Sequence, residues 1–290
     1  MTRKLSILLY LFISLTANAT SQLGDIIIWN GDTLTLFCNP LKLRSDWKEI
    51  SKIIASELEN EGRRLYSEEY EVMISTACIR GYIAEWTVIN DKIYLSNIYS
   101  CHDKKVKVDL SKVFGKELKE NLLFANWITD KLVIPQGECI EYVHLDYNSI
   151  YETETIIEFK DGILVESRIY KNYIARKSKF TIDPNPNSYL EFIYTQINWE
   201  DLPDLKNKHI QVSIGIQPNQ EGQIDSLLIN YTYMLDSSSL IADRENVFFK
   251  EAIRIAELIP DWDVIYQRGH IVRRNFTVFF DQTTKDKYAR

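Results

Sequence analysis

Residues 81–100 read GYIAEWTVINDKIYLSNIYS, and this stretch decides the fold of the first half of the chain. Apolar and polar residues alternate through most of it, which is the pattern of half-buried strands. Asn90 and Asp91 are turn residues at its centre. The stretch therefore predicts a hairpin in which Val88 lies opposite Ile93.

The hairpin register bears on the four cysteines, Cys38, Cys78, Cys101 and Cys139. In an oxidising compartment they allow up to two disulfides and three connectivities. Continuing the register outward from the turn brings Cys78 and Cys101 within a residue or two of each other, and bridged cysteines need Cα atoms within about 7 Å. We therefore expect a Cys78–Cys101 disulfide, which leaves Cys38–Cys139 by elimination.

A metal site is the alternative use of these residues. It would take ligands from Cys78, Cys101, His102, Cys139 and His144. The sequence lacks the C-x₂-C spacing that makes a zinc assignment strong. We expect disulfides, and neither a metal nor another cofactor.

The N-terminus has the composition of a secretory signal. Arg3 and Lys4 precede the apolar run 5–15, and residues 17–19 form an A-x-A cleavage motif. The run is shorter than the roughly 20 residues that a spanning helix needs. We expect removal of residues 1–19 on export, a periplasmic or otherwise exported mature protein, and no membrane insertion afterwards. An uncleaved N-terminal anchor is the alternative.

The charge balance disfavours two classes of partner. The chain carries a formal net charge of −7, and loss of the signal would make it more acidic. Such a protein repels phosphate backbones and gains nothing from an anionic lipid surface. We expect no nucleic-acid partner.

Residues 20–170 are predicted to form a disulfide-braced α+β domain, an antiparallel β-meander with one packed helix. Asn30-Gly31 and Asp161-Gly162 mark further tight hairpins. A helix over residues 47–65 follows from apolar residues at helical spacing. Asp46 is its expected N-cap, and Glu49 would complete a capping box.

Residues 171–187 are basic and then proline-containing, without an apolar period, and are predicted to be a linker. After it we expect a helix, two strands, a second helix over 244–259 and a terminal strand over 271–280. Asp243 is available as N-cap of the second helix, which Pro260 ends.

Three stretches of residues 188–281 carry a resemblance. IQVSIGIQPNQEGQIDSLLI (210–229) compares with a strand-turn-strand of the type V-x-V-x-F-x-V-x-x-D-G-x-V-x-x-V-x-I. Phe248, Ala252, Ile255 and Trp262 compare with F-x-x-x-A-x-x-A-x-x-x-W, and QRGHIVRRNFTVFF (267–280) compares with a basic turn and an aromatic terminal strand. This part resembles the C-terminal domain of the energy-transducing TonB family. The family's Pro-rich spacer and its Tyr-Pro dipeptide are missing.

The resemblance implies a function for the terminal strand. In the family this strand is an exposed edge that accepts a short peptide from an outer-membrane transporter, by strand addition. The positions carried over are Arg268, Ile271, Arg273, Arg274, Phe276, Val278 and Phe280. The alternative is that the apolar side chains fill the core while the arginines protect an edge from aggregation.

Catalytic motifs are missing from the sequence. It contains no nucleophile elbow, P-loop, H-E-x-x-H or dinucleotide fingerprint, and its histidines are scattered. Glu85 beside Trp86 lacks a partner carboxylate of the glycosidase kind. The first domain, with its CxRGYxAEW segment, loosely resembles uncharacterised exported bacterial proteins.

We therefore expect a non-enzymatic protein that binds a protein or peptide strand. The alternatives are an accessory or anchored component of TonB-dependent transport, an envelope hydrolase and an immunity factor.

Overall fold

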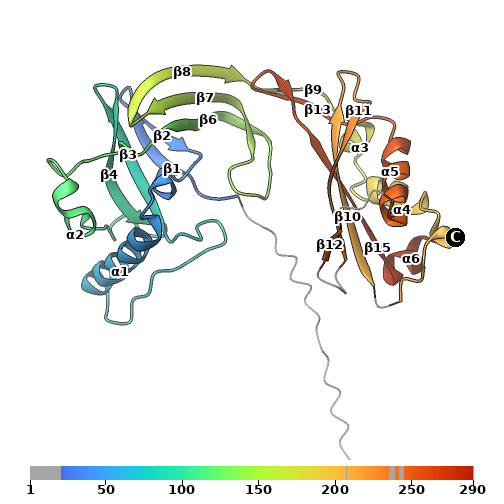
Figure 1. Ribbon diagram of the computed structural model, residues 1–290, viewed down its shortest axis with the longest axis horizontal. Helices are drawn as coiled ribbons and strands as arrows, with labels where there is room; N and C mark the ends of the chain where they lie inside the picture. Colours follow the sequence, from blue (N-terminus) through green and yellow to red (C-terminus); the bar gives the residue numbers. More distant parts are fainter. Residues whose placement is uncertain (1–20, 207, 235–238, 242–244, 290) are drawn as a thin grey trace, which may run out of the picture. The chain divides into compact units, whose positions relative to one another are not determined.

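The structure, a computed structural model, describes residues 21–206, 208–234, 239–241 and 245–289 (Figure 1). The expected signal (1–19) and the expected N-cap Asp243 lie outside these residues. The chain divides into two compact units, one of Met1–Tyr151 with Thr155–Ile169 and one of Glu152–Glu154 with Tyr170–Arg290. Both contain helices and strands, which confirms the α+β class.

The first unit is built on a sheet with the strand order β2-β1-β3-β4-β8-β7-β6, and β5 pairs with β4 off this path. Its strands are β1 (Asp25–Trp29), β2 (Asp32–Leu36), β3 (Tyr82–Ile89), β4 (Lys92–Ser100), β5 (Leu123–Phe124), β6 (Asp130–Glu141), β7 (Ile150–Lys160) and β8 (Ile163–Lys171). The Phe37 N–H donates to the Val133 carbonyl at 2.8 Å, so the strands at the two ends of this order meet.

The sheet departs from the expected antiparallel meander in two places. β1 pairs in parallel with β3, because the chain between them crosses over through helix α1 (Trp47–Leu65). β4 pairs with β8, which is distant in sequence, rather than with the next long strand. Local alternation predicts strands but does not fix which strands become neighbours.

The hairpin turns are confirmed. Val88 lies opposite Ile93, and both central residues have positive φ, 49° at Asn90 and 61° at Asp91. These are the angles that a two-residue turn needs to match the twist of its strands.

Helix α1 has the predicted bounds, with Ile50, Ile54 and Leu58 buried along one face. The predicted capping box is wrong. The Asp46 side chain caps no backbone N–H, because both its oxygens accept from the Arg44 guanidinium at 2.8 Å. Short helical segments follow at η1 (Pro40–Leu43), α2 (Leu110–Phe114) and η2 (Gly115–Glu117).

The second unit places a sheet of order β12-β11-β10-β15 beside a helical layer (Figure 1). The strands are β10 (His209–Pro218), β11 (Ile224–Met234), β12 (Ser239–Ile241) and β15 (Arg274–Asp281). The helical segments are α3 (Lys179–Ile182), α4 (Ser188–Thr195), η3 (Trp199–Asp201), α5 (Val247–Leu258) and α6 (Gln282–Tyr288). Asn246 caps α5 by accepting the Phe248 N–H at 2.9 Å.

A second, smaller sheet in this unit joins β9 (Tyr173–Arg176), β13 (Val264–Gln267) and β14 (His270–Ile271). Residues 171–187, predicted as a linker, thus contain β9 and α3. Tyr173 stacks on Tyr266 at 5.0 Å between ring centroids, and Asp263 accepts the Ser178 N–H at 2.6 Å. These contacts come from residues some 90 positions away in the chain, so local composition did not indicate them.

Candidate functional site

The terminal strand is shorter than predicted. Ile271 belongs to β14 and lies opposite Tyr266, while the Val272 N–H donates to the Ile265 carbonyl at 2.8 Å. The edge strand β15 begins only at Arg274. The prediction of one strand over 271–280 is therefore wrong, because a pairing with β13 holds the first two residues in another sheet.

Arg268 occupies the β13–β14 turn rather than a strand flank. Its backbone has a positive φ of 53°, and its Nε lies 2.6 Å from Oε2 of Glu154, whose side chain is 2% exposed. Gln267 donates to the other oxygen of the same carboxylate at 2.7 Å. Arg268 thus neutralises a buried charge within its own unit, whereas Arg273 is exposed.

Three of the four apolar residues of β15 fill the core, and the fourth, Phe279, is exposed. Phe276, Val278 and Phe280 have no exposed surface. Phe276 packs edge-on against Trp262, and Phe280 packs against Phe248. The structure thus confirms the alternative prediction for these side chains, which is that they fill the core.

The backbone of β15 lies at the border of its sheet. It pairs with β10 from Ile216↔Arg274 to His209↔Asp281. On its outer side the Phe279 N–H donates to the Tyr194 hydroxyl of α4 at 3.3 Å. Because main-chain groups alternate in direction along a strand, the N–H and C=O of Thr277 share this outer direction.

A cavity of about 290 Å³ lies at the first residues of β15. It is lined by Ser178, Phe180, Thr181, Tyr189, Ile259, Asp261, Trp262, Asp263, Arg274 and Asn275. Asp263 accepts from the Ser178 N–H and from the Thr181 hydroxyl at 2.9 Å. Burial raises the pKa of the Tyr189 hydroxyl above its ordinary value, although Arg274 opposes this.

Comparison of the chain with protein-family models, with curated proteins and with solved structures gives no match. Within the described residues, no helix is both long and apolar enough to cross a membrane. Nor does that part of the chain bring three or more His, Cys, Asp or Glu residues together as metal ligands.

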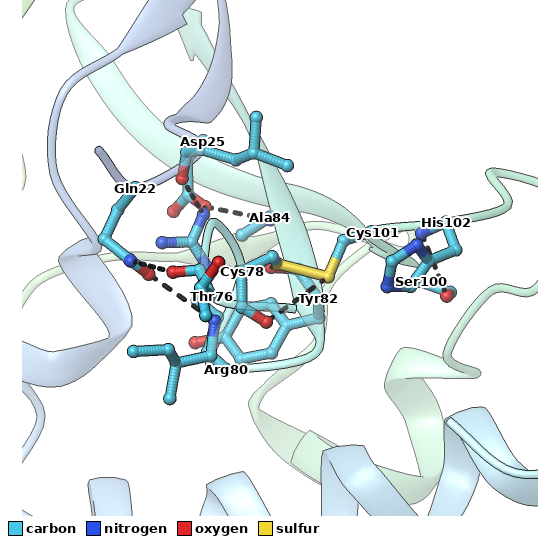
Figure 2. The surroundings of a disulfide bond; sticks show 12 residues. Gln22, Asp25, Thr76, Cys78, Arg80, Tyr82, Ala84, Ser100, Cys101 and His102 are labelled. Atoms are coloured by element: carbon cyan, nitrogen blue, oxygen red, sulfur yellow. Dashed lines mark hydrogen bonds and ion pairs between the residues drawn. A yellow bond between two sulfur atoms is a disulfide. The ribbon is translucent and has the colours of Figure 1, made fainter. Parts of the chain in front are cut away.

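The first unit contains the predicted Cys78–Cys101 disulfide, with a Cα–Cα distance of 6.6 Å (Figure 2). The β3–β4 ladder shifts by one residue between Glu85 and Trp86 and runs on to Tyr82↔Ser100, so that Cys101 follows its last pair directly and Cys78 precedes it by four residues. The geometric expectation is confirmed.

The other expected disulfide, Cys38–Cys139, is not formed, and both thiols are free. Phe37 is bonded to Val133 of β6, and at about 3.3 Å per residue Cys139 lies on the order of 20 Å further along that strand. The expected Cys38–Cys139 disulfide is therefore wrong, and the two cysteines remain thiols. Burial raises the pKa of the Cys38 thiol well above its ordinary value, and nearby Asp25 adds to this.

Next to the disulfide lies a buried ion pair (Figure 2). The Asp25 side chain is fully buried and lies 2.7 Å from Nη2 of Arg80, which is 9% exposed. The same carboxylate accepts from the Ala84 N–H at 3.1 Å and from Trp86 Nε1 at 3.0 Å. Complete burial raises the pKa of the Asp25 carboxyl, and Arg80, Trp86 and Ala84 oppose this rise.

The Arg80 guanidinium has further partners. It donates to the Tyr82 carbonyl at 2.7 Å, to the Leu23 carbonyl at 2.9 Å and to the Tyr147 hydroxyl. It therefore connects β1, the start of β3 and the segment before β7. This cluster was not predicted. The sequence does show its two charged members, Asp25 at the start of an apolar strand and Arg80 two residues after Cys78.

The Glu85 carboxylate is held within the β3–β4 sheet by three side-chain hydrogen bonds. Its carboxylate accepts from Ser96 Oγ at 3.1 Å, Asn97 Nδ2 at 2.7 Å and the Tyr99 hydroxyl at 2.9 Å. Burial, together with the bond to Glu85, raises the pKa of Tyr99 to about 12. These bonds fix a bulge between Glu85 and Trp86 in the β3–β4 ladder.

Proposed function

We propose that the chain is an exported, non-enzymatic binding protein whose second unit accepts a peptide strand at the outer edge of β15. One observation carries this proposal: β15 lies at the border of its sheet, and a cavity opens beside its first residues. An edge supplies main-chain hydrogen bonds to an added strand, and pockets for alternate side chains supply preference.

On the outer side of β15, an added peptide can replace the present hydrogen-bond acceptor of the Phe279 N–H. The hydrogen bond from the Phe279 N–H to Tyr194 is 3.3 Å long, beyond the usual 2.9–3.0 Å for this type of bond. A carbonyl of an incoming peptide would replace the Tyr194 hydroxyl as a shorter, better acceptor. The N–H and C=O of Thr277 would supply the next pair of bonds.

The cavity is small and has room for one side chain. Its volume of about 290 Å³ lies at the lower end of the range of roughly 300–1,000 Å³ for small-molecule sites. Phe180 and Tyr189 supply apolar walls, and Asp261 and Arg274 supply charges of both signs. An amphipathic side chain of the added peptide, with an apolar stem and a polar tip, fits this lining.

The order of elements also supports the proposal. α4, β10, β11, α5 and β15 follow one another as the resemblance to the TonB C-terminal domain implies. The partner is then a short extended segment of another envelope protein, such as an outer-membrane transporter. No catalytic role is assigned to either unit.

The test removes one outward N–H. Thr277→Pro deletes that group without touching the bonds to β10, whereas Thr277→Ala keeps it and loses the same 3.0 Å hydroxyl contact with Ser213. The probe is a phage-displayed library of random heptapeptides selected on the wild-type chain. We expect the selected peptides to bind the alanine variant as they bind the wild type. For the proline variant we expect their affinity to fall about tenfold or more, which corresponds to about 1.4 kcal/mol of binding free energy. Equal binding to both variants would reject the β15 edge.

A further inference from the structure

A second strand edge lies in the first unit, along β8. β8 pairs with β7 on one side, but with β4 only at its first residues (Figure 1). Lys92 lies opposite Ile163, and the Leu164 N–H donates to the Asp91 carbonyl at 2.7 Å. Beyond Leu164, no main-chain bond to this side of β8 is found in the described part of the chain.

The open stretch, residues 165–169, exposes two apolar side chains on one face. Val165 is 59% exposed and Ile169 is 73% exposed. Exposed edges usually carry charged side chains, proline or a bulge that hinder pairing with another chain. Residues 165–169 (Val-Glu-Ser-Arg-Ile) contain no proline, and their two charged residues, Glu166 and Arg168, are of opposite sign.

The direction of the main-chain groups follows from the one bond to β4. Because the Leu164 N–H points to the β4 side, the N–H and C=O groups of Glu166 and Arg168 point to this same side. The side chains of Glu166 and Arg168 share one face of the strand, where they form an ion pair. Val165, Ser167 and Ile169 share the other face.

We propose that this edge pairs with the same edge of a second copy of the chain, antiparallel and with the two-fold axis at Ser167. In this register Glu166 of each copy lies opposite Arg168 of the other, and Val165 lies opposite Ile169. The two Glu166–Arg168 pairs are the hydrogen-bonded ones, as the outward direction of their main-chain groups requires. Ser167 faces Ser167 in a non-hydrogen-bonded pair.

Neighbouring registers are unfavourable. A two-fold axis at Glu166 places the Glu166 residues of the two copies opposite each other, and an axis at Arg168 does the same for the two Arg168 residues. Like charges directly opposite destabilise a strand pair. A shift by one residue sets outward main-chain groups opposite inward ones, so no ladder forms. The sequence of the edge is thus self-complementary in one register, which is the property of a two-fold symmetric interface.

The expected association is reversible. One pair of short edges buries less than the roughly 1,200 Å² typical of stable complexes. We expect a dimer that forms with rising concentration and dissociates on dilution. This proposal concerns the first unit and is independent of peptide binding by the second.

The test is sedimentation velocity of the full chain, in a Cys139→Ser background that removes the exposed free thiol. Glu166→Arg and Arg168→Glu each place like charges opposite one another, and we expect both single variants to be monomeric. The double exchange E166R/R168E restores opposite charges, and we expect the dimer to return. A monomeric wild type, or a dimer that persists in both single variants, would overturn the proposal.

A cross-linking measurement tests the register itself. Residues in a non-hydrogen-bonded antiparallel pair have Cα atoms about 4.5 Å apart, within disulfide range. In the same background, Ser167→Cys should form a disulfide-linked dimer on mild oxidation. Ser67→Cys, at another exposed serine of this unit, is the matched control and should stay monomeric. Equal cross-linking of the two variants would contradict the register.

Discussion

Replacing Arg80 by methionine removes the cation that faces the buried Asp25 carboxylate. The two groups are 2.7 Å apart, and both side chains are almost inaccessible to water. Methionine retains an apolar stem of similar length but leaves Asp25 with the Ala84 and Trp86 donors alone. It also frees the Tyr82 and Leu23 carbonyls that Arg80 satisfies.

The expected cost is large. Removing one partner of a buried ion pair destabilises a fold by about 3–5 kcal/mol, because the remaining charge stays buried without compensation. Domains have only about 5–15 kcal/mol of stability in total. We therefore expect Arg80→Met to cost about 4 kcal/mol, and the double variant D25N/R80M to recover part of it, since an amide carries no charge.

The assay is urea unfolding at pH 7 and pH 4, followed by tryptophan fluorescence, to which Trp86 beside Asp25 contributes. Burial already raises the pKa of Asp25 in the folded state, and loss of Arg80 raises it further. The folded variant then binds more protons than the unfolded chain, so its stability falls as the pH rises through the folded pKa. The penalty of Arg80→Met should thus be smaller at pH 4 than at pH 7.

Arg64→Met is the matched control. Arg64 forms an exposed ion pair with Glu61 on α1, and we expect no measurable change in the free energy of unfolding. A cost for Arg80→Met below about 1 kcal/mol at pH 7 would refute the reasoning, because a surface pair contributes no more than that. A penalty that grows toward pH 4 would refute the assigned role of Asp25.

Three further outcomes are expected. Reducing the disulfide, whose cysteines are 23 residues apart, should lower the free energy of unfolding by about 3 kcal/mol from loop entropy, as measured by urea unfolding; no change would mean that the unfolded loop is already restricted. Tyr194→Phe should speed hydrogen exchange of the Phe279 amide, and unchanged exchange would place its acceptor elsewhere. Cys139, which is exposed, should react at once with a thiol reagent, whereas Cys38, which is partly buried and whose thiol pKa is raised, should react more slowly; similar rates would contradict this difference between the two thiols.

Features set by neighbouring residues could be predicted from the sequence. The turn at Asn90-Asp91 set the β3–β4 register from Ile89 to Trp86, and extending that register outward indicated the Cys78–Cys101 disulfide in spite of the one-residue shift at Glu85. The apolar stripe of α1 gave the bounds of that helix because its spacing repeats over five turns. In each case the signal lies within one or two adjacent elements.

Features that join distant parts of the chain could not be predicted. The Asp25–Arg80 pair links residues 55 positions apart, and the break before β15 depends on a pairing of Ile271 within another sheet. The contact of Tyr194 with the β15 edge likewise joins a helix to a strand 85 residues later. Alternation and helical spacing describe which face a residue takes, but not which element covers it.

The most direct test of the account is an amide NMR titration of the full chain with a heptapeptide from the library. Strand addition at β15 predicts that the largest shifts and the strongest gain in exchange protection fall on the amides of Thr277 and Phe279. Shifts that leave both amides unchanged would contradict peptide binding at this edge.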